Sequence, residues 1–302
     1  MTILNEKLYS LLTFFIYDTA KIFILLFVFI ALIGVIRTYI SKKTIESKLA
    51  KKGFLSYFFA SIFGAITPFC SCSSIPIFIS FIKLKIPLGV TFAFLITSPL
   101  VNEYLVVLMF SFFGFKVTAL YVFFGMSLGI VCGAVISKLK MEKYIVEDIY
   151  NSNIDKKIEG REYSSFQERI RFGLSEAIDI VKKLYLWIII AVAIGSLIHN
   201  YVPEEKIHNL ISKLGFFSVP VAVTLGVPMY GSCAAILPIA AALFQKGIPL
   251  GTALSFMMAI SALSLPEAIM LRRVIKLKLI AVFFAITTLG IIAIGYIFNL
   301  VQ

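Results

Sequence analysis

Long apolar runs separated by short polar breaks dominate the chain. The first run extends from Ile22 to Ile36, and the following runs cover 53–69, 75–82, 86–113 and 117–136. Continuous hydrophobicity of this kind is typical of membrane helices, whereas the strands of an outer-membrane barrel alternate apolar and polar positions over about ten residues. The pattern therefore predicts an all-α integral membrane protein.

Two breaks within these runs carry proline and small polar residues. The first break, Thr67–Pro76, contains two prolines together with Cys70 and Cys72, and the second break is Thr97–Glu103. Because proline removes a backbone donor and clashes with the preceding turn, we expect the helices to open at both breaks. Irregular backbone is tolerated in a membrane only where protein or a water-filled cavity surrounds it, so both breaks are candidate transport positions.

Composition and charge agree with a membrane location. Of the 302 residues, 60% are hydrophobic and 15% are charged, whereas soluble domains are about half apolar and about a quarter charged. The formal net charge is +12, but no soluble segment interleaves basic residues with stacking aromatic residues. Lys and Arg gather instead in the cytoplasmic loops of membrane proteins. We therefore expect the lipid bilayer, and no nucleic acid, among the partners.

The interval from Lys138 to Lys183 is the longest hydrophilic part of the chain. In its later part, Ser165–Lys183, apolar residues recur at helical spacing among charged ones, which predicts an amphipathic helix leading into the next span. The chain is thereby divided into a first transmembrane repeat at 1–138, a cytoplasmic linker with the amphipathic helix at 139–176, and a second transmembrane repeat at 177–302.

The second half of the sequence repeats the first. Ile86-Pro87-Leu88-Gly89 recurs unchanged as Ile248-Pro249-Leu250-Gly251. Further matches in the same order are Gly53 with Gly215, Pro68 with Pro228, Cys72 with Cys233, Pro76 with Pro238, Asn102-Glu103 with Pro266-Glu267, and Gly133 with Gly295. The offset stays narrow, from 160 positions between 68 and 228 to 164 positions between 103 and 267. Apolar composition alone does not produce such an ordered series, which indicates a duplication.

Basic residues occupy different places in the two halves. The first half has its basic loop at 37–52, after its first span, whereas the second half has its basic cluster at 272–278, before its last span. Under the positive-inside rule, this exchange predicts two inverted-topology repeats with broken or re-entrant helices. Inversion needs an odd number of crossings per half, either five spanning segments or three crossings plus a re-entrant hairpin. The hairpins at 53–82 and 215–245 are short for full spans, so we favour re-entrant hairpins.

The breaks of the two halves predict a binding site. In inverted-repeat transporters the interrupted helices meet near the membrane midplane, so Cys70 and Cys72 should converge with Cys233 of the mirrored break Pro228–Pro238. Thiolates suit soft cations or trivalent arsenic and antimony. We expect nearby hydroxyls to bind substrate as well, namely those of Ser71, Ser73, Ser74, Tyr230 and Ser232. Cysteine is also a common buried apolar residue, and we prefer that interpretation for the isolated Cys132.

Two acidic residues next to the later breaks form a second candidate group. An ionisable side chain inside a span is costly and often marks a pathway or a proton relay. We therefore predict Glu103, Glu267 and the adjacent Asn102 as ion-coupling residues. The alternative is that both carboxyl groups lie near the water interface. No phosphate loop, nucleophile motif or zinc motif occurs, so we expect no enzyme activity, catalytic residue, cofactor or resident metal.

The run Thr67-Pro68-Phe69-Cys70-Ser71-Cys72-Ser73-Ser74-Ile75-Pro76 resembles the signature of a predicted-permease family that includes ArsP. Gly231-Ser232-Cys233, the two Ile-Pro-Leu-Gly turns and the Pro-Glu pair at Glu267 also look like that family. The resemblance covers nearly the whole chain. It implies an inner-membrane permease and, for ArsP members, efflux of trivalent organoarsenicals through cysteine coordination. By that resemblance Cys70, Cys72 and Cys233 are site residues, although arsenic specificity does not follow from membership.

Together these features predict a multi-pass permease of the cell inner membrane for secondary efflux of a small soft or thiol-reactive solute, such as a trivalent arsenical. One alternative is a permease for a small anion or a sulfur compound, which would use the serines and the half-helix ends. Another alternative is a membrane thiol oxidoreductase with Cys70 and Cys72 as its redox pair. The substrate, the direction of transport and the coupling ion stay open, as does assembly into a homo-oligomer.

Overall fold

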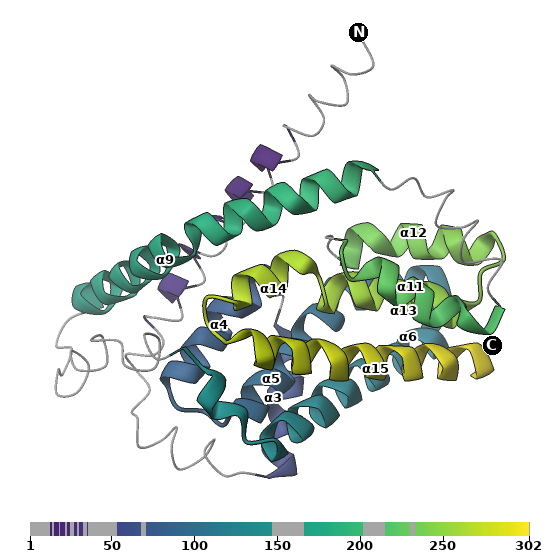
Figure 1. Ribbon diagram of the computed structural model, residues 1–302, viewed down its shortest axis with the longest axis horizontal. Coiled ribbons are helices and arrows are strands. Elements are labelled where there is room, and N and C mark those ends of the chain that lie inside the picture. The colour runs from purple at the N-terminus through teal and green to yellow at the C-terminus, as the bar shows by residue number, and fades with distance from the viewer. Residues whose placement is uncertain are drawn as a thin grey trace, which may run out of the picture.

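The protein is a bundle of helices in the part of the chain that the computed structural model describes. These residues are 53–67, 71–146, 166–201, 215–229 and 233–301, with single helical positions between 13 and 35. Within them, extended backbone pairs only at one antiparallel bridge, between Ile145 and Ile275. Figure 1 shows the bundle with one long helix, α9, along its side. The predicted all-α class is therefore confirmed for the described residues.

The first half contains three short helices and one long, kinked helix. They are α3 (Phe54–Ile66), α4 (Ser71–Lys83), α5 (Leu88–Leu100) and α6 (Glu103–Lys138). The backbone of Gly114 has φ 74° and ψ 179°, which interrupts the helical geometry of α6 and bends it. Only glycine adopts such a conformation without a steric cost, so the kink follows from the sequence.

The second half has the same order of elements. They are η2 (Gly215–Phe217), α11 (Ser218–Gly226), α12 (Cys233–Gln245), α13 (Leu250–Ala262), α14 (Leu265–Leu271) and α15 (Leu277–Val301). A short turn replaces the Gly114 kink between α14 and α15. In the order of elements, α14 and α15 together thus correspond to α6 of the first half.

Between the halves lie η1 (Met141–Tyr144) and α9 (Phe166–Tyr201). At 36 residues, α9 is one continuous helix of about 54 Å. The amphipathic stretch predicted up to Lys183 is therefore the first part of this helix and not a separate connector. The boundary expected at residue 176 falls inside α9. Helix α14 packs against α9, as Figure 1 also shows.

Corresponding turns make the same hydrogen bonds in both halves. Between α4 and α5 the Ile86 N–H donates to the Phe81 carbonyl at 3.1 Å, and between α12 and α13 the Ile248 N–H donates to the Leu243 carbonyl at 3.1 Å. Both partners are 162 positions apart, 81 with 243 and 86 with 248. The two Ile-Pro-Leu-Gly sequences therefore form equivalent turns, each with its proline directly before the next helix.

Two glycine pairs bring helices of each half into close contact. A Cβ atom on Gly89 would collide with the Gly133 carbonyl, and a Cβ atom on Gly251 would collide with the Gly295 carbonyl. The start of α5 therefore lies against the end of α6, and the start of α13 lies against the end of α15. Small residues that let helix backbones approach are typical of helix packing in membranes.

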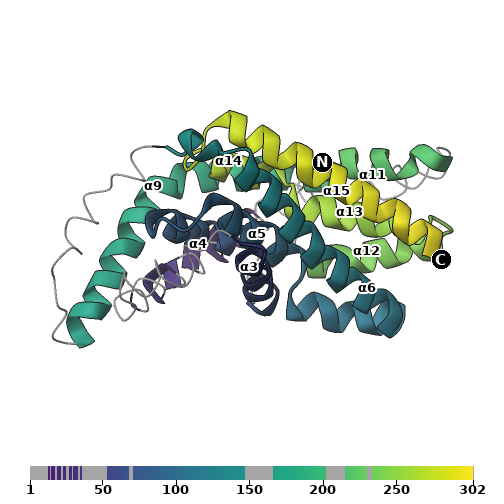
Figure 2. The ribbon, with the colours of Figure 1, turned by 90° about the horizontal axis from the view of Figure 1, so that it is seen from below.

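The last helices of the two halves pack side by side in opposite directions. The Phe124 ring of α6 lies 5.7 Å from the Phe298 ring of α15, while Leu128 of α6 contacts Gly290 of α15. Residue numbers rise along α6 while those of the contacting residues fall along α15, so the two helices are antiparallel. The Lys276 N–H donates to the Tyr144 carbonyl at 2.8 Å, so α15 starts close to where α6 has ended. Figure 2 shows α6 and α15 crossing the bundle together.

The helices differ in whether they can cross a membrane. Among the described residues, three helical stretches are long and apolar enough, namely Glu103–Lys138, Leu250–Leu271 and Leu277–Val301. Helices α3, α4 and α5 have 13 residues each, which corresponds to about 20 Å, whereas the hydrocarbon core is about 30 Å thick. Many large apolar side chains on the outside of the molecule are exposed, for example those of Phe54 and Tyr104. Lipid contact explains this exposure in a membrane protein.

Candidate functional site

Each half has a helix interruption where the sequence predicts the substrate site. Helix α3 ends at Ile66 and α4 starts at Ser71, while α11 ends at Gly226 and α12 starts at Cys233. The predicted residues Cys70, Tyr230 and Ser232 lie outside the described residues. For Ser71, Cys72, Ser73 and Cys233 the structure describes only the backbone, as the first residues of α4 and α12. The interruptions are thus confirmed, and the convergence of the thiols stays a prediction.

The second proline of each break does not interrupt its helix, contrary to expectation. Pro76 lies inside α4 and Pro238 lies inside α12, each at the sixth helical position. The first four N–H groups of a helix have no intrahelical partner in any case. The sixth position lies beyond these four groups, so each proline removes one backbone hydrogen bond, to the carbonyl four residues earlier, and the helix continues through it. The opening of the backbone is narrower than the predicted Thr67–Pro76 segment.

Hydroxyl groups join α4, α3 and α5 at this end of the first half. The hydroxyls of Ser74 and Ser98 are hydrogen-bonded at 2.9 Å and link α4 to α5, and both side chains are fully buried. The hydroxyls of Ser61 and Thr97 are hydrogen-bonded at 2.7 Å and link α3 to α5. Ser98 therefore has a packing role, whereas substrate contact by Ser74 stays a prediction.

The break between α5 and α6 is a helix cap. The Asn102 side chain accepts a hydrogen bond from the Leu105 N–H at 2.8 Å. This oxygen satisfies one of the free donors at the start of α6, which accounts for asparagine here without an ion-coupling role. Glu103 is the first residue of α6, and its side chain is exposed on the molecule. A carboxylate at a helix N-terminus is favourable because of the helix dipole.

Glu267 has a different environment from Glu103. Its side chain is 1% exposed, and it lies on the short helix α14. Ser264 caps α14 and accepts from the Glu267 N–H at 3.4 Å, as Asn102 accepts from the Leu105 N–H. The caps at 102 and 264 are again 162 positions apart. Glu267 therefore corresponds to the buried Leu105, and Glu103 to Leu265, so the sequence match of the two glutamates is wrong by two residues.

Helices of each half pack against helices of the other half. Helix α4 of the first half packs against α14 of the second, α12 of the second packs against α6 of the first, and α5 packs against α13. Figure 1 shows α4 next to α14, and Figure 2 shows α12 next to α6. Helices α4 and α12, which carry candidate residues, therefore each pack against the opposite half, while a meeting of the two breaks themselves stays a prediction.

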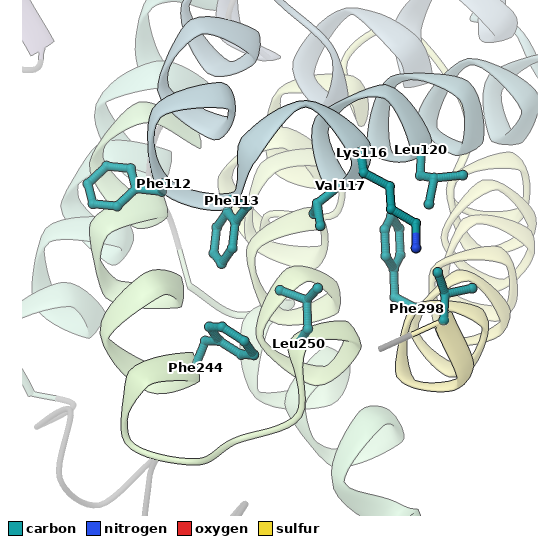
Figure 3. Close-up of a pocket in the computed structure, with 9 residues that line it drawn as sticks. Phe112, Phe113, Lys116, Val117, Leu120, Phe244, Leu250 and Phe298 are labelled. Atoms are coloured by element: carbon teal, nitrogen blue, oxygen red, sulfur yellow. The ribbon is translucent and has the colours of Figure 1, made fainter.

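A cavity lies away from these breaks, at the bend of α6. Its volume is about 310 Å³, and residues of α6, α12, α13 and α15 line it. Figure 3 shows Phe113 of α6 facing Phe244 of α12, with Lys116 reaching toward Phe298 of α15. Sequence reasoning missed this cavity, although a glycine followed closely by a lysine inside an apolar run was a signal for it.

The described residues offer no ready set of metal ligands. No group of three or more His, Cys, Asp or Glu side chains lies together among those searched. The cysteine side chains at the breaks are not among them.

Comparison with known proteins identifies the family. A profile of the ArsP type, described as a predicted permease, matches residues 7–300 of the chain. The chain belongs to this permease family. Membership is consistent with the apolar helices. No solved structure matches the chain.

Three curated relatives have low sequence identity to this chain, between 21% and 26%. UPF0718 protein YcgR of Bacillus subtilis is 26% identical over 110 residues, which is 36% of this chain and 37% of the relative. A putative two-component membrane permease complex subunit of Streptococcus mutans is 24% identical over 59% of this chain and 58% of the relative. UPF0718 protein MJ0584 of Methanocaldococcus jannaschii is 21% identical over 82% of this chain and 83% of the relative. The matched part of the chain thus covers 37% of the B. subtilis relative and 58% of the S. mutans relative.

Proposed function

We propose that the protein is a secondary permease of the inner membrane that exports a small soft or thiol-reactive solute through a site between two inverted halves. The observation that carries the proposal is the crossed packing of the interrupted helices, α4 on α14 and α12 on α6. Such a crossing would surround the breaks with protein from both halves. This is the setting in which membrane proteins tolerate irregular backbone and bind substrates.

Two contacts support the inversion. The equivalent starts of α5 and α13 are held against the ends of α6 and α15 by the glycine pairs Gly89–Gly133 and Gly251–Gly295. Because α6 and α15 run in opposite directions, these two contacts lie at opposite ends of the bundle. The short lengths of α3 and α4 favour a re-entrant hairpin over two full crossings.

The chemistry at the breaks favours a soft solute. Helix α4 begins next to Cys70 and contains Cys72, and α12 begins at Cys233. A helix N-terminus stabilises a thiolate because its free N–H groups carry partial positive charge. Thiolates bind trivalent arsenic and similar soft centres in preference to hard oxygen-seeking ions. Hydroxyls of Ser71, Ser73, Ser74, Tyr230 and Ser232 would complete the lining.

Glu267 is the residue that we propose for ion coupling. A buried carboxyl is costly in a membrane protein unless it serves a pathway or a proton relay. The first half has a leucine at the corresponding position, so packing does not require a carboxyl there. The printed description of the S. mutans relative adds a further expectation, namely that the chain works with a partner subunit.

Flux measurements test the proposal against its alternatives. Purified protein in proteoliposomes would be given a trivalent methylarsenical, antimonite, sulfite or thiosulfate, and flux would be compared with that in protein-free vesicles. We expect flux of the arsenical or antimonite. Flux of the sulfur oxyanions alone would favour the anion permease, because it needs no thiol. A reversible Cys70–Cys72 disulfide without any flux would favour the thiol oxidoreductase.

A further inference from the structure

The cavity at the bend of α6 is large and mainly apolar. Eight of its lining residues are apolar, and the ninth is a lysine; they are Phe112, Phe113, Lys116, Val117, Leu120, Phe244, Leu250, Phe298 and Val301. Its volume of about 310 Å³ is twice the ~150 Å³ of a cavity that binds benzene. Protein interiors are close-packed with few voids larger than a water molecule, so an apolar hollow of this size is a candidate binding cavity.

The corresponding region of the second half is filled by the chain itself. Offsets of 162 positions relate Lys116 to Lys278 and Phe113 to Ile275. There the segment after α6 pairs with the start of α15, since the Val146 N–H donates to the Val274 carbonyl at 3.0 Å and Ile145 forms a bridge with Ile275. The Lys278 Nζ lies 5.5 Å from the centroid of the Tyr144 ring. This lysine thus has an electron-rich group beneath it.

Burial reflects this difference between the halves. Val274 and Ile275 are 0% exposed under the η1 segment, whereas Phe112, at the position that corresponds to Val274, is 47% exposed. Lys116 is exposed too, next to Phe115 at 75%. The cavity of the first half therefore opens to the surface at a place where its counterpart is closed.

The position of the cavity relates it to the membrane. Phe298 and Val301 are at the end of α15, and the basic residues Arg272, Arg273, Lys276 and Lys278 are at its start. Helix α15 has 25 residues and spans about 37 Å, slightly more than the hydrocarbon core. The cavity therefore lies at the interface opposite the basic cluster, where lipid head groups and the first part of their chains meet the protein.

We propose that this cavity binds one anionic phospholipid, with an acyl chain between Phe113, Phe244 and Phe298 and its phosphate at Lys116. The apolar lining fits an acyl chain, and the single cation at the open side complements a negatively charged head group. In the corresponding region of the second half, the Tyr144 ring provides the electron-rich partner of the Lys278 ammonium group. The bilayer supplies the lipid directly to the exposed side of the cavity. This inference is independent of the transported solute.

Photo-crosslinking tests the proposal. The full chain in nanodiscs would be irradiated with phosphatidylglycerol that carries a diazirine on its acyl chain, or with phosphatidylcholine of the same chain, and the labelled peptides identified by mass spectrometry. We expect label at residues 112–120 and 298–301, with phosphatidylglycerol preferred. Lys116→Gln should lower that preference about fivefold. Leu120→Trp should abolish the label by filling the cavity.

Lys278→Gln is the matched control, because it changes the corresponding lysine of the filled region and should leave this label unchanged. Val301→Trp fills the cavity from its rim and replaces Leu120→Trp if that variant does not fold. Equal labelling by both lipids would overturn the proposal, as would label that persists in the filled variants. A shift from dimer to monomer in the filled variants, with lipid labelling unchanged, would overturn it too, since a second chain would then be the occupant.

Discussion

Replacing Cys70 and Cys72 together by serine should reduce flux of a trivalent methylarsenical at least about tenfold in proteoliposomes. Serine has nearly the size of cysteine, but its hydroxyl is a hard and far weaker ligand for a soft centre. Loss of supporting interactions alone lowers affinity at metal sites 10- to 100-fold, and loss of the ligands themselves should cost at least as much. The measurement is initial flux at equal amounts of inserted protein.

Cys132→Ala is the matched control for this change. Cys132 is 1% exposed on α6, away from the breaks. Its replacement should leave flux within about twofold and cost only the stability expected for a small buried side chain. Full arsenical flux in the double serine variant would remove the thiol site from the account. An equal loss in Cys132→Ala would show that the effect is not specific to the breaks.

Glu267→Leu should abolish the response of flux to a proton gradient while the protein inserts and folds. The change copies Leu105, which occupies the corresponding position of the first half and is fully buried. We therefore expect the variant to insert in the same amount as the unchanged protein, with flux that a pH gradient no longer drives.

Glu103→Leu is the control for Glu267→Leu, because it introduces the residue found at the corresponding position of the second half, Leu265. Glu103 is exposed at the start of α6, so its loss should cost about 0.3–1 kcal/mol through the helix dipole. Proton-driven flux should persist in this variant. If Glu267→Leu kept its response to the gradient, or if only Glu103→Leu lost it, the assignment of Glu267 would be wrong.

The sequence was a good guide to the helices and their interruptions. Continuous apolar runs predicted the helices because a helix satisfies its backbone hydrogen bonds within one segment, and the unchanged Ile-Pro-Leu-Gly turns located both halves in register. The starts of helices were placed well at the Ile-Pro-Leu-Gly turns, where Pro87 and Pro249 directly precede a helix. The two breaks with Pro76 and Pro238 were placed too widely, because each helix continues through its proline with the loss of one backbone hydrogen bond.

The candidate site was harder to predict than the fold. Matching Glu103 with Glu267 followed residue identity, but the hydrogen bonds of the caps give the register, and they make Leu105 the counterpart of Glu267. The cavity at Lys116 depends on which segment covers which helix end, and this is a property of tertiary packing. In the second half Tyr144 and Ile145 cover that place, which no local pattern indicates.

Side-specific labelling tests the central claim, that the site lies between two inverted halves. Lys85 and Lys246 are exposed in the two equivalent turns, α4 to α5 and α12 to α13. Each would be changed to cysteine in a variant without the four native cysteines, and intact cells would be treated with a membrane-impermeant maleimide before and after permeabilisation. We predict that Lys246→Cys is labelled from outside and Lys85→Cys only after permeabilisation. Labelling of both positions from the same side would contradict the account.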